Sequence, residues 1–167
     1  MTAGKSRAVL VTGASRGIGR AVALALAEAG ADVAVNYHEK LTDAQAVVAA
    51  VQKAGRRAVA VGADVADSGA VGTMMHAVTA QLGPVDVLVS NAGLSRVQPL
   101  EDVTAAPFNE MLAENLRAPF LLAQHTVPAM RERGSGRIRD ADAGRGICGV
   151  RPLNPWTRSV AWRNAGR

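Results

Sequence analysis

The chain has 167 residues, of which 49% are hydrophobic and 20% are charged, and its formal net charge is +5. This length and composition fit one folded domain with a sizeable core and exclude a disordered chain. The sequence has no run of about 18 apolar residues and no secretory signal after Met1, so we expect a cytoplasmic protein without a membrane span. The single cysteine, Cys148, excludes an internal disulfide and has no partner at metal-ligand spacing, so we expect no metal.

The excess positive charge lies near the end of the sequence. Residues 1–136 carry 12 basic and 12 acidic side chains, whereas residues 137–167 carry 7 arginines and 2 aspartates. Both tryptophans and the cysteine also fall in the second segment, which has no lysine. A basic segment with two tryptophans is one of the features of nucleic-acid-binding proteins. Because it contains no recognisable binding motif, we expect no nucleic-acid partner.

Strands and helices alternate in the predicted order of elements. Short apolar runs predict four buried strands, at Ala8–Val11, Asp32–Asn36, Ala58–Ala63 and Val85–Ser90. Alanine-rich stretches of helical period separate these runs, which is the pattern of βαβ units around a parallel sheet.

Two of the intervening helices carry apolar stripes that we expect to be buried. In the first helix the stripe consists of Ile18, Val22, Leu26 and Ala29. The helix before the fourth strand has a stripe of Val71, Met74, Met75, Val78 and Leu82, which we interpret as core.

The pattern changes after a long helix predicted over Phe108–Arg133 and interrupted at Pro119 and Pro128. A fifth strand begins at Gly136, but charges at Arg139–Asp142 stand where a central parallel strand needs an apolar run. We therefore predict an incomplete, doubly wound α/β sheet of Rossmann type, with four strands and the start of a fifth. The predicted domain spans residues 1–138, and residues 139–167 form a separate basic tail.

The segment Thr12–Gly19 lies between the first strand and the first helix, where a turn rich in glycine predicts a phosphate-binding loop. Glycine allows a positive φ and lets a pyrophosphate approach the bare backbone, and the N-terminus of the helix behind it favours an anion. The sequence therefore predicts a dinucleotide site. Its candidate residues in this loop are Gly13, Ser15, Arg16, Gly17, Ile18 and Gly19.

The loop has the spacing T-G-x-x-x-G-x-G, and Ser90-Asn91-Ala92-Gly93 closes the fourth strand. Together these motifs resemble the short-chain dehydrogenase/reductase family, and most of all its bacterial 3-oxoacyl-carrier-protein reductase type, over residues 5–138. The resemblance implies hydride transfer between a nicotinamide dinucleotide and a small carbonyl or alcohol. It also implies that Asn91, Ala92 and Gly93 bind the cofactor ribose, and that members form homo-oligomers, which the aberrant tail places in doubt here.

The end of the second strand bears on the choice of cofactor. It carries Tyr37 and His38, and no acid stands where NAD-specific sites hold the ribose hydroxyls. Arg16, His38 and Lys40 would supply positive charge to a 2′-phosphate, so we expect NADP(H) in preference to NAD(H). Glu39 keeps the NAD(H) alternative open, and Arg16 has a simpler interpretation as a solvated loop charge.

The third strand is followed by Asp64 and Val65. The resemblance implies that Asp64 accepts a hydrogen bond from the adenine amino group. The alternative role, capping the next helix, suits Asp67 better than Asp64.

Asn115 is the one candidate catalytic residue. Pro119 has no N–H to donate to the Asn115 carbonyl, which leaves that carbonyl free to bind water. The resemblance, carried by Asn-Leu-x-x-x-Phe over Asn115–Phe120, implies that this residue holds a proton-relay water. An asparagine that satisfies a helix defect is the structural alternative.

The family's catalytic serine and Tyr-x-x-x-Lys are absent. The chain's one tyrosine is Tyr37, and its last lysine is Lys53. Residues 153–161 weakly resemble the helix that follows this motif in the family, and a shifted reading frame would restore a tyrosine near Gly146. The sequence therefore predicts a truncated and frameshifted oxidoreductase that is itself inactive. The alternative is a non-catalytic dinucleotide-binding module.

Overall fold

The structure is a computed structural model that describes residues 6–140 and the backbone of one further strand, residues 160–163. Helices and strands alternate as far as the fourth strand, and short turns connect them. The elements are β1 (Ala8–Val11), α1 (Gly17–Glu28), β2 (Asp32–Tyr37), α2 (Leu41–Lys53), β3 (Ala58–Gly62), α3 (Ser68–Leu82), β4 (Val87–Ser90), η1 (Leu100–Asp102), α4 (Ala105–Leu112), η2 (Ala113–Arg117), α5 (Ala118–Glu132), β5 (Ser135–Asp140) and β6 (Val160–Arg163).

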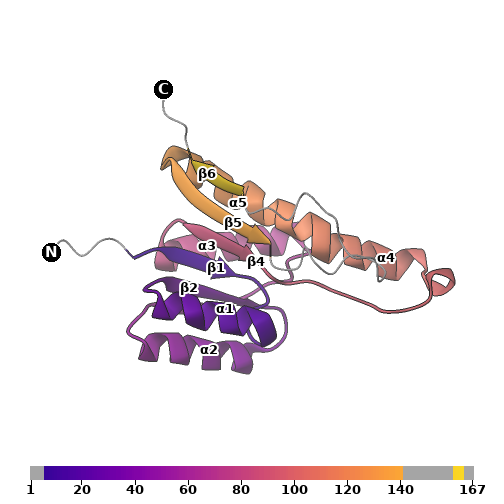
Figure 1. The fold of residues 1–167 in the computed structure, drawn as a ribbon, viewed down its shortest axis with the longest axis horizontal. Coiled ribbons are helices and arrows are strands. Elements are labelled where there is room, and N and C mark those ends of the chain that lie inside the picture. The colour runs from indigo at the N-terminus through magenta and orange to yellow at the C-terminus, as the bar shows by residue number, and fades with distance from the viewer. Residues whose placement is uncertain (1–5, 141–159, 164–167) are drawn as a thin grey trace.

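One sheet has the strand order β3-β2-β1-β4-β5-β6. Strands β1 to β5 pair in parallel, and β6 pairs antiparallel with β5. Helices α1 and α2 cover one face, and α3 and α5 cover the other (Figure 1). The predicted Rossmann-type α/β fold is confirmed. Its strand order reverses between β1 and β4, the place where such sheets bind ligands.

Alternation along the strands divides the core into two parts, one on each side of the sheet. Val9 and Val11 of β1 pack with α1 and α2, whereas Leu10 packs with α3 and α5. All three side chains are fully buried. Each predicted strand exists, with boundaries that differ by at most two residues. The central strands therefore form a rigid base for the loops at their ends.

The prediction for the buried face of α1 was wrong for Ile18 and Ala29, which are exposed, whereas Val22 and Leu26 are half-buried and pack against the core. The prediction for α3 is confirmed. Ile18 is 60% exposed, and the residues of α1 that face the sheet are Gly19, Ala23 and Ala27. Small side chains bring the helix close to the sheet, and the larger neighbours are displaced to the flanks of the contact. In α3 the buried residues are the predicted Val71, Met74, Met75, Val78 and Leu82.

The predicted long helix is interrupted once, by the π-helical turn η2 at Ala113–Arg117. This turn lies just before Pro119, which cannot donate to the Asn115 carbonyl, so the helix widens there. The expected break at Pro128 was wrong, because α5 continues through that residue. Leu122, Thr126 and Met130 hold this part of α5 in the core.

Strand β5 extends further than predicted, through Arg139 to Asp140. The expected break was wrong because the backbone pairs with β4, Val89 opposite Arg139 and Ser90 opposite Asp140, whatever the side chains are. Residues of β5 are exposed or half-buried, so their charges remain in contact with water.

The tail contributes a strand where the sequence comparison indicated a helix. Val160 and Ala161 lie in β6, opposite Ile138 and Arg137 of β5. The free edge of β5 offers unpaired backbone groups, and a second strand satisfies them. Residues 153–159 and the proposed tyrosine position near Gly146 lie outside the described residues.

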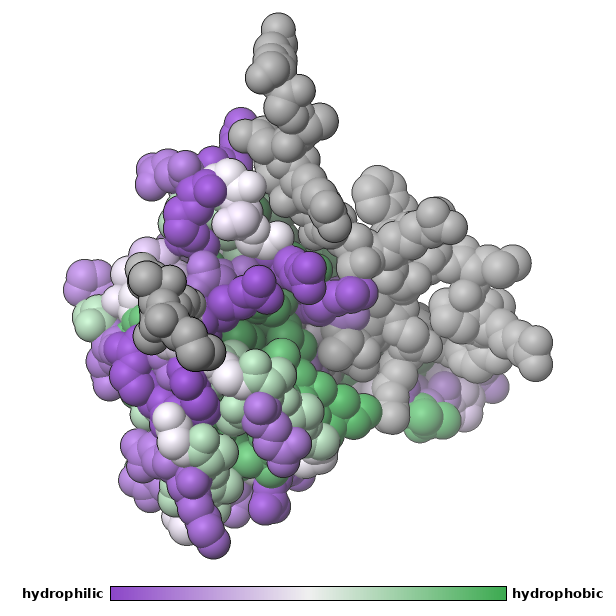
Figure 2. All heavy atoms as spheres, turned by 60° about the vertical axis from the view of Figure 1, so that its left-hand side comes forward, coloured by the Kyte–Doolittle hydropathy of each residue, from purple (hydrophilic) through white to green (hydrophobic). Residues whose placement is uncertain are grey.

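A charged cluster lies at the opposite end of the sheet from the loops after β1 and β4. The Asp32 carboxylate is buried at the start of β2 and accepts hydrogen bonds from Ser6, Arg56 and Arg57. Burial alone would raise its pKa, but the hydrogen bonds from Ser6 and Arg57 and the Arg57 charge lower it to about 2. Side chains on this side of the molecule are largely hydrophilic (Figure 2).

Candidate dinucleotide-binding site

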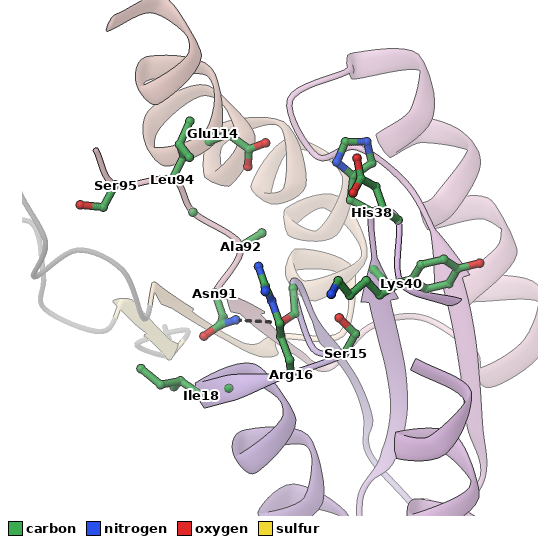
Figure 3. Close-up of a pocket in the computed structure, with 15 residues that line it drawn as sticks. Ser15, Arg16, Ile18, His38, Lys40, Asn91, Ala92, Leu94, Ser95 and Glu114 are labelled. Carbon is green, nitrogen blue, oxygen red and sulfur yellow. Dashed lines mark hydrogen bonds between the residues drawn. The ribbon is translucent and has the colours of Figure 1, made fainter. Parts of the chain in front are cut away.

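A cavity of about 740 Å³ opens at the carboxyl ends of β1, β2 and β4. This volume lies in the range of ligand pockets, about 300–1,000 Å³. Figure 3 shows the loops after these strands surrounding the cavity. Its lining comprises Gly13, Ser15, Arg16, Gly17, Ile18, Tyr37, His38, Glu39, Lys40, Asn91, Ala92, Gly93, Leu94, Ser95 and Glu114.

Thr12 and Asn91 fasten the loop after β1 to the loop after β4. The Thr12 hydroxyl accepts hydrogen bonds from the backbone N–H groups of Asn91 and Ala92, at 2.9 and 3.0 Å. In return, the Asn91 side chain donates to the carbonyl of Thr12 at 2.9 Å and to that of Gly13 at 3.3 Å. Asn91 thus ties the carboxyl ends of β1 and β4 together. This exchange fixes one wall of the cavity relative to the next.

Asn36 fastens the third loop and was not among the predicted site residues. Its side chain is 1% exposed and accepts from the Gly13 N–H at 3.2 Å. The same amide donates to the carbonyls of Val61 and Ala63, at 3.3 and 3.2 Å. Asn36 therefore connects the ends of β1, β2 and β3. The one signal for it in the sequence is a polar residue inside the apolar run of β2.

Glycine is required at two positions of the phosphate-binding loop. A Cβ on Gly19 would lie 2.5 Å from both the Asn91 amide nitrogen and the Gly13 carbonyl oxygen. Gly17 has a φ of +56°, and no atom lies within 4 Å of the place where its Cβ would be. The first glycine thus permits close packing and the second permits the turn and leaves open space.

The N-terminus of α1 faces this open space without a side-chain cap. The side chain of its N-cap residue, Arg16, accepts no hydrogen bond from the first turn, which also contains no acidic residue. The first N–H groups of a helix carry partial positive charge and need acceptors. They are therefore suited to bind the oxygens of a phosphate group.

Two cations enter the cavity from different loops. Figure 3 shows the side chains of Arg16, from the loop after β1, and Lys40, from the loop after β2, in the same part of the site. Arg16 is exposed and forms none of the ion pairs found among the described residues. Glu39 and His38 line the same cavity. The site therefore has positive groups available for an anionic ligand.

Asp64 and Val65 are absent from the lining of this cavity. The Asp64 side chain accepts from the Ala66 N–H at 2.8 Å, and Val65 is buried. Asp67 caps α3, accepting from the N–H groups of Gly69 and Ala70 at 2.7 and 2.9 Å. The capping role thus belongs to Asp67, as predicted, and the role of Asp64 toward adenine stays a prediction.

Asn115 lies in η2 and holds the loop after β4. Its side chain donates to the Leu94 carbonyl at 2.7 Å and accepts from the Leu94 N–H at 2.9 Å. Both polar groups of that residue's backbone are thereby satisfied. The side chain thus has a clear positioning role, while the predicted relay water on the Asn115 backbone carbonyl stays a prediction.

Glu114, together with Leu94 and Ser95, completes the cavity lining and was missed by the sequence analysis. Burial raises the pKa of the Glu114 carboxyl above its ordinary value, the Asp64 charge raises it further, and His38 opposes the shift. A π-helical turn places this residue, and no local sequence pattern identifies it.

The described residues around this cavity fit a dinucleotide. They form an uncapped helix N-terminus, an open glycine turn and a cationic corner beside one cavity of suitable size. Within residues 6–140 there is no group of His, Cys, Asp or Glu side chains that would hold a metal ion. None of the described helices has the length and apolar character needed to cross a membrane.

Comparison with known proteins supports the same class. The sequence model of the family described as short chain dehydrogenase matches residues 7–141. The chain belongs to this family of oxidoreductases. The match extends three residues beyond the predicted boundary at residue 138.

Individual relatives are similar over the same region. A hydroxynaphthalene reductase of Aspergillus fumigatus is 39% identical over 128 residues, which are 77% of this chain and 47% of the relative. A 3-oxoacyl-[acyl-carrier-protein] reductase of Staphylococcus aureus is 41% identical over 133 residues, 80% of this chain and 54% of the relative. The chain spans about half the length of these relatives.

A solved structure confirms the fold. It is assigned as a short-chain alcohol dehydrogenase of Sinorhizobium meliloti, and it is 38% identical with a TM-score of 0.78. The match covers 90% of this chain and 60% of that one.

Proposed function

We propose that the chain binds NADP(H) in the cavity at the carboxyl ends of β1, β2 and β4. The observation that carries this proposal is the uncapped N-terminus of α1 behind an open glycine turn. The backbone of Ser15–Gly19 would hold the pyrophosphate, and Asn91–Gly93 would lie along a ribose. A second cavity, of about 640 Å³, is lined by residues of the continuous helical segment 109–120 and includes no glycine loop.

The preference for NADP(H) over NAD(H) rests on charge. The two cofactors differ by a 2′-phosphate on the adenosine ribose, and Arg16 and Lys40 are the cations that line the cavity. Tyr37 and His38 end β2 without a carboxylate to hold the ribose hydroxyls. A guanidinium and an ammonium group recognise phosphate through charge-assisted hydrogen bonds. The negative charge of Glu39 opposes this preference, but the two positive charges of Arg16 and Lys40 exceed it.

We propose that this chain descends from a carbonyl reductase but has little turnover of its own. The bound nicotinamide would supply or accept hydride, and a small carbonyl or alcohol would be the substrate. The 167 residues contain no Tyr-x-x-x-Lys, because Tyr37 is the one tyrosine and Lys53 the last lysine. Loss of a general acid costs about 10² to 10⁴ in rate. A dinucleotide-binding module without catalysis is thus the second candidate function.

Titration of the full chain with NADPH and with NADH, followed by nicotinamide fluorescence, tests the binding. We expect saturable binding of both, with NADPH tighter by about tenfold from the additional charge-assisted contacts. The absence of saturable binding of either cofactor would contradict the proposal. Sustained oxidation of NADPH with small carbonyl compounds would contradict the low turnover while leaving the binding intact.

The remaining functional predictions concern partners and location. We propose a small molecule as the partner, no membrane association and no nucleic-acid binding, in the cytoplasm. A salt-sensitive mobility shift of DNA that requires residues 137–167 would contradict the proposed absence of nucleic-acid binding.

A further inference from the structure

Glu114 is a carboxylate in the cavity that the dinucleotide-binding motifs do not explain. It is half-buried, and Figure 3 shows it extending from its helix toward the side of the site that carries His38. None of the hydrogen bonds or ion pairs among the described residues involves its carboxylate. A half-buried acid without a donor is costly unless a ligand supplies one.

A second carboxylate lies near Glu114. Asp64 lies in the loop after β3 that η2 contacts, since the Arg117 side chain donates to the Ala66 carbonyl at 2.9 Å, and the charge of Asp64 raises the pKa of Glu114. One oxygen of Asp64 accepts from the Ala66 N–H, and its other oxygen has no partner among the described residues. The two acids therefore repel each other and together offer acceptors in excess of the available donors.

A group with two N–H donors satisfies such a pair, and the exocyclic amino group of adenine is one. Resting on the proposed cofactor, we infer that Glu114 and Asp64 each accept one N–H of this amino group, so that Glu114 is a specificity-determining residue for the adenine base. The other charged residues of the cavity, Arg16 and Lys40, suit the phosphates instead. Hypoxanthine, with an oxo group in place of the amino group, places an acceptor against both carboxylates.

The raised pKa of Glu114 also gives the direction in which pH changes the preference for adenine over hypoxanthine. Because the pKa of Glu114 is raised, this residue is protonated before an ordinary glutamate as the pH falls. A neutral carboxyl donates a hydrogen bond to an oxo group, so discrimination against hypoxanthine decreases at acid pH. The other charged groups facing this region are Arg16 after β1, the residues His38, Glu39 and Lys40 after β2, and Asp64 after β3.

The test compares the Kd of NADPH with that of its hypoxanthine analogue, using the full chain. We expect at least about a tenfold preference for NADPH at neutral pH, from one lost hydrogen bond and one unpaired charge. Glu114→Gln reduces the preference to about threefold or less, because an amide both donates and accepts. Its preference also becomes insensitive to mild acid. Glu39→Gln, a matched change in the same cavity, alters both affinities by the same factor.

The outcomes separate this inference from the proposed function. If the unaltered chain binds NADPH and its analogue equally, or if Glu114→Gln keeps the full preference, the role of Glu114 is wrong while NADP(H) binding stands. If neither compound binds, both proposals fail. Circular dichroism melting shows whether the variant is folded, and Glu114→Asp, which keeps the carboxylate, retains part of the preference.

Discussion

The carboxylates at the two ends of the sheet lie in opposite environments. At the amino end, Asp32 is buried among donors from Ser6, Arg56 and Arg57, and its pKa falls to about 2. At the cavity, none of the described residues donates a hydrogen bond to Glu114, and its pKa is raised. The Asp32 carboxylate is thus satisfied without a ligand and that of Glu114 is not, although the buried Nε of Arg56 beside Asp32 also has no partner among the described residues. A half-buried carboxylate without a donor therefore distinguishes the candidate site, whereas the buried Asp32 carboxylate is stabilised within the protein.

The same contrast holds for the backbone. At the carboxyl ends of β1 and β4, the N–H groups at the start of α1 lack a side-chain cap. The helix α3, whose N-terminus lies outside the cavity lining, is capped by Asp67 at 2.7 and 2.9 Å. Capping stabilises a helix by about 1 kcal/mol, and α1, like α2 and α4, lacks this stabilisation, so its first N–H groups are available to an anion.

The largest effect is expected from Gly19→Val at the functional end. Its Cβ would lie 2.5 Å from the Asn91 amide and the Gly13 carbonyl oxygen, so the loop must move away from β4. We expect NADPH affinity to fall by about 100-fold or more, measured by fluorescence titration, in line with the several kcal/mol that overpacking costs. Gly72→Ala in α3 is the matched control, since the nearest atom would lie 3.7 Å from its Cβ. Normal NADPH binding by Gly19→Val would contradict the assignment of this loop.

Asp32→Asn tests the structural end. The amide loses a charge and one acceptor while Arg56 and Arg57 remain, so we expect unfolding to become easier by about 2–3 kcal/mol. NADPH affinity of the folded protein stays unchanged, because Asp32 lies at the far end of β2. Urea denaturation measures the first quantity and titration the second. The control, Asp43→Asn in the exposed first turn of α2, costs a few tenths of a kcal/mol.

The pH dependence of stability follows from the same carboxylate. The folded pKa of Asp32 is about 2 against an ordinary value of 3.8, so its contribution is fully present above the ordinary value. It is lost as the pH falls from there through the folded pKa, and it amounts to at most about 2 kcal/mol. Denaturation curves at a series of acid pH values measure this loss. If the stability of Asp32→Asn falls as steeply with decreasing pH as that of the unaltered chain, the loss belongs to other groups.

Arg16→Ala sharpens the comparison by removing one unpaired cation from the cavity. We expect NADPH binding to weaken by about tenfold and NADH binding to change by less than about twofold, since NADH lacks the 2′-phosphate. Lys40→Ala shifts the same ratio in the same direction. Parallel titrations with both cofactors measure it. Equal weakening of the two would show that Arg16 contacts the pyrophosphate that they share.

Local sequence patterns were enough to identify the part of the site that depends on the strand ends. Thr12–Gly19 and Asn91–Gly93 each follow a strand directly, so the loop and its position follow from one short segment. Asn36 and Glu114 could not be found in this way. The role of Asn36 appears once three strands are aligned, and that of Glu114 once η2 turns it into the cavity.

The errors in the fold have a common physical origin. Tertiary contacts decided each of them against a local rule: small residues instead of large ones on the face of α1 against the sheet, a helix that continues through Pro128, and charged residues within β5. Hydrophobic periodicity indicates which face of a helix is buried on average, but it does not indicate how closely the neighbouring element packs against that face. At Gly136 that distance is short, since a Cβ there would lie 2.3 Å from the Met130 side chain.

The smallest expected effect concerns Asn115, which connects η2 to the loop after β4. Asn115→Ala removes both hydrogen bonds to Leu94, of 2.9 and 2.7 Å, and leaves the strands untouched. We expect the Leu94 amide to exchange with solvent about tenfold faster, equivalent to about 1.4 kcal/mol of local opening, and overall stability to fall by less than that. Hydrogen exchange measured by NMR or mass spectrometry resolves this segment. Because Leu94 and Ser95 line the cavity with Glu114, a loosened loop also weakens NADPH binding by a few-fold. If exchange at Leu94 is unchanged, the hydrogen bonds of Asn115 do not restrain this wall of the cavity in solution.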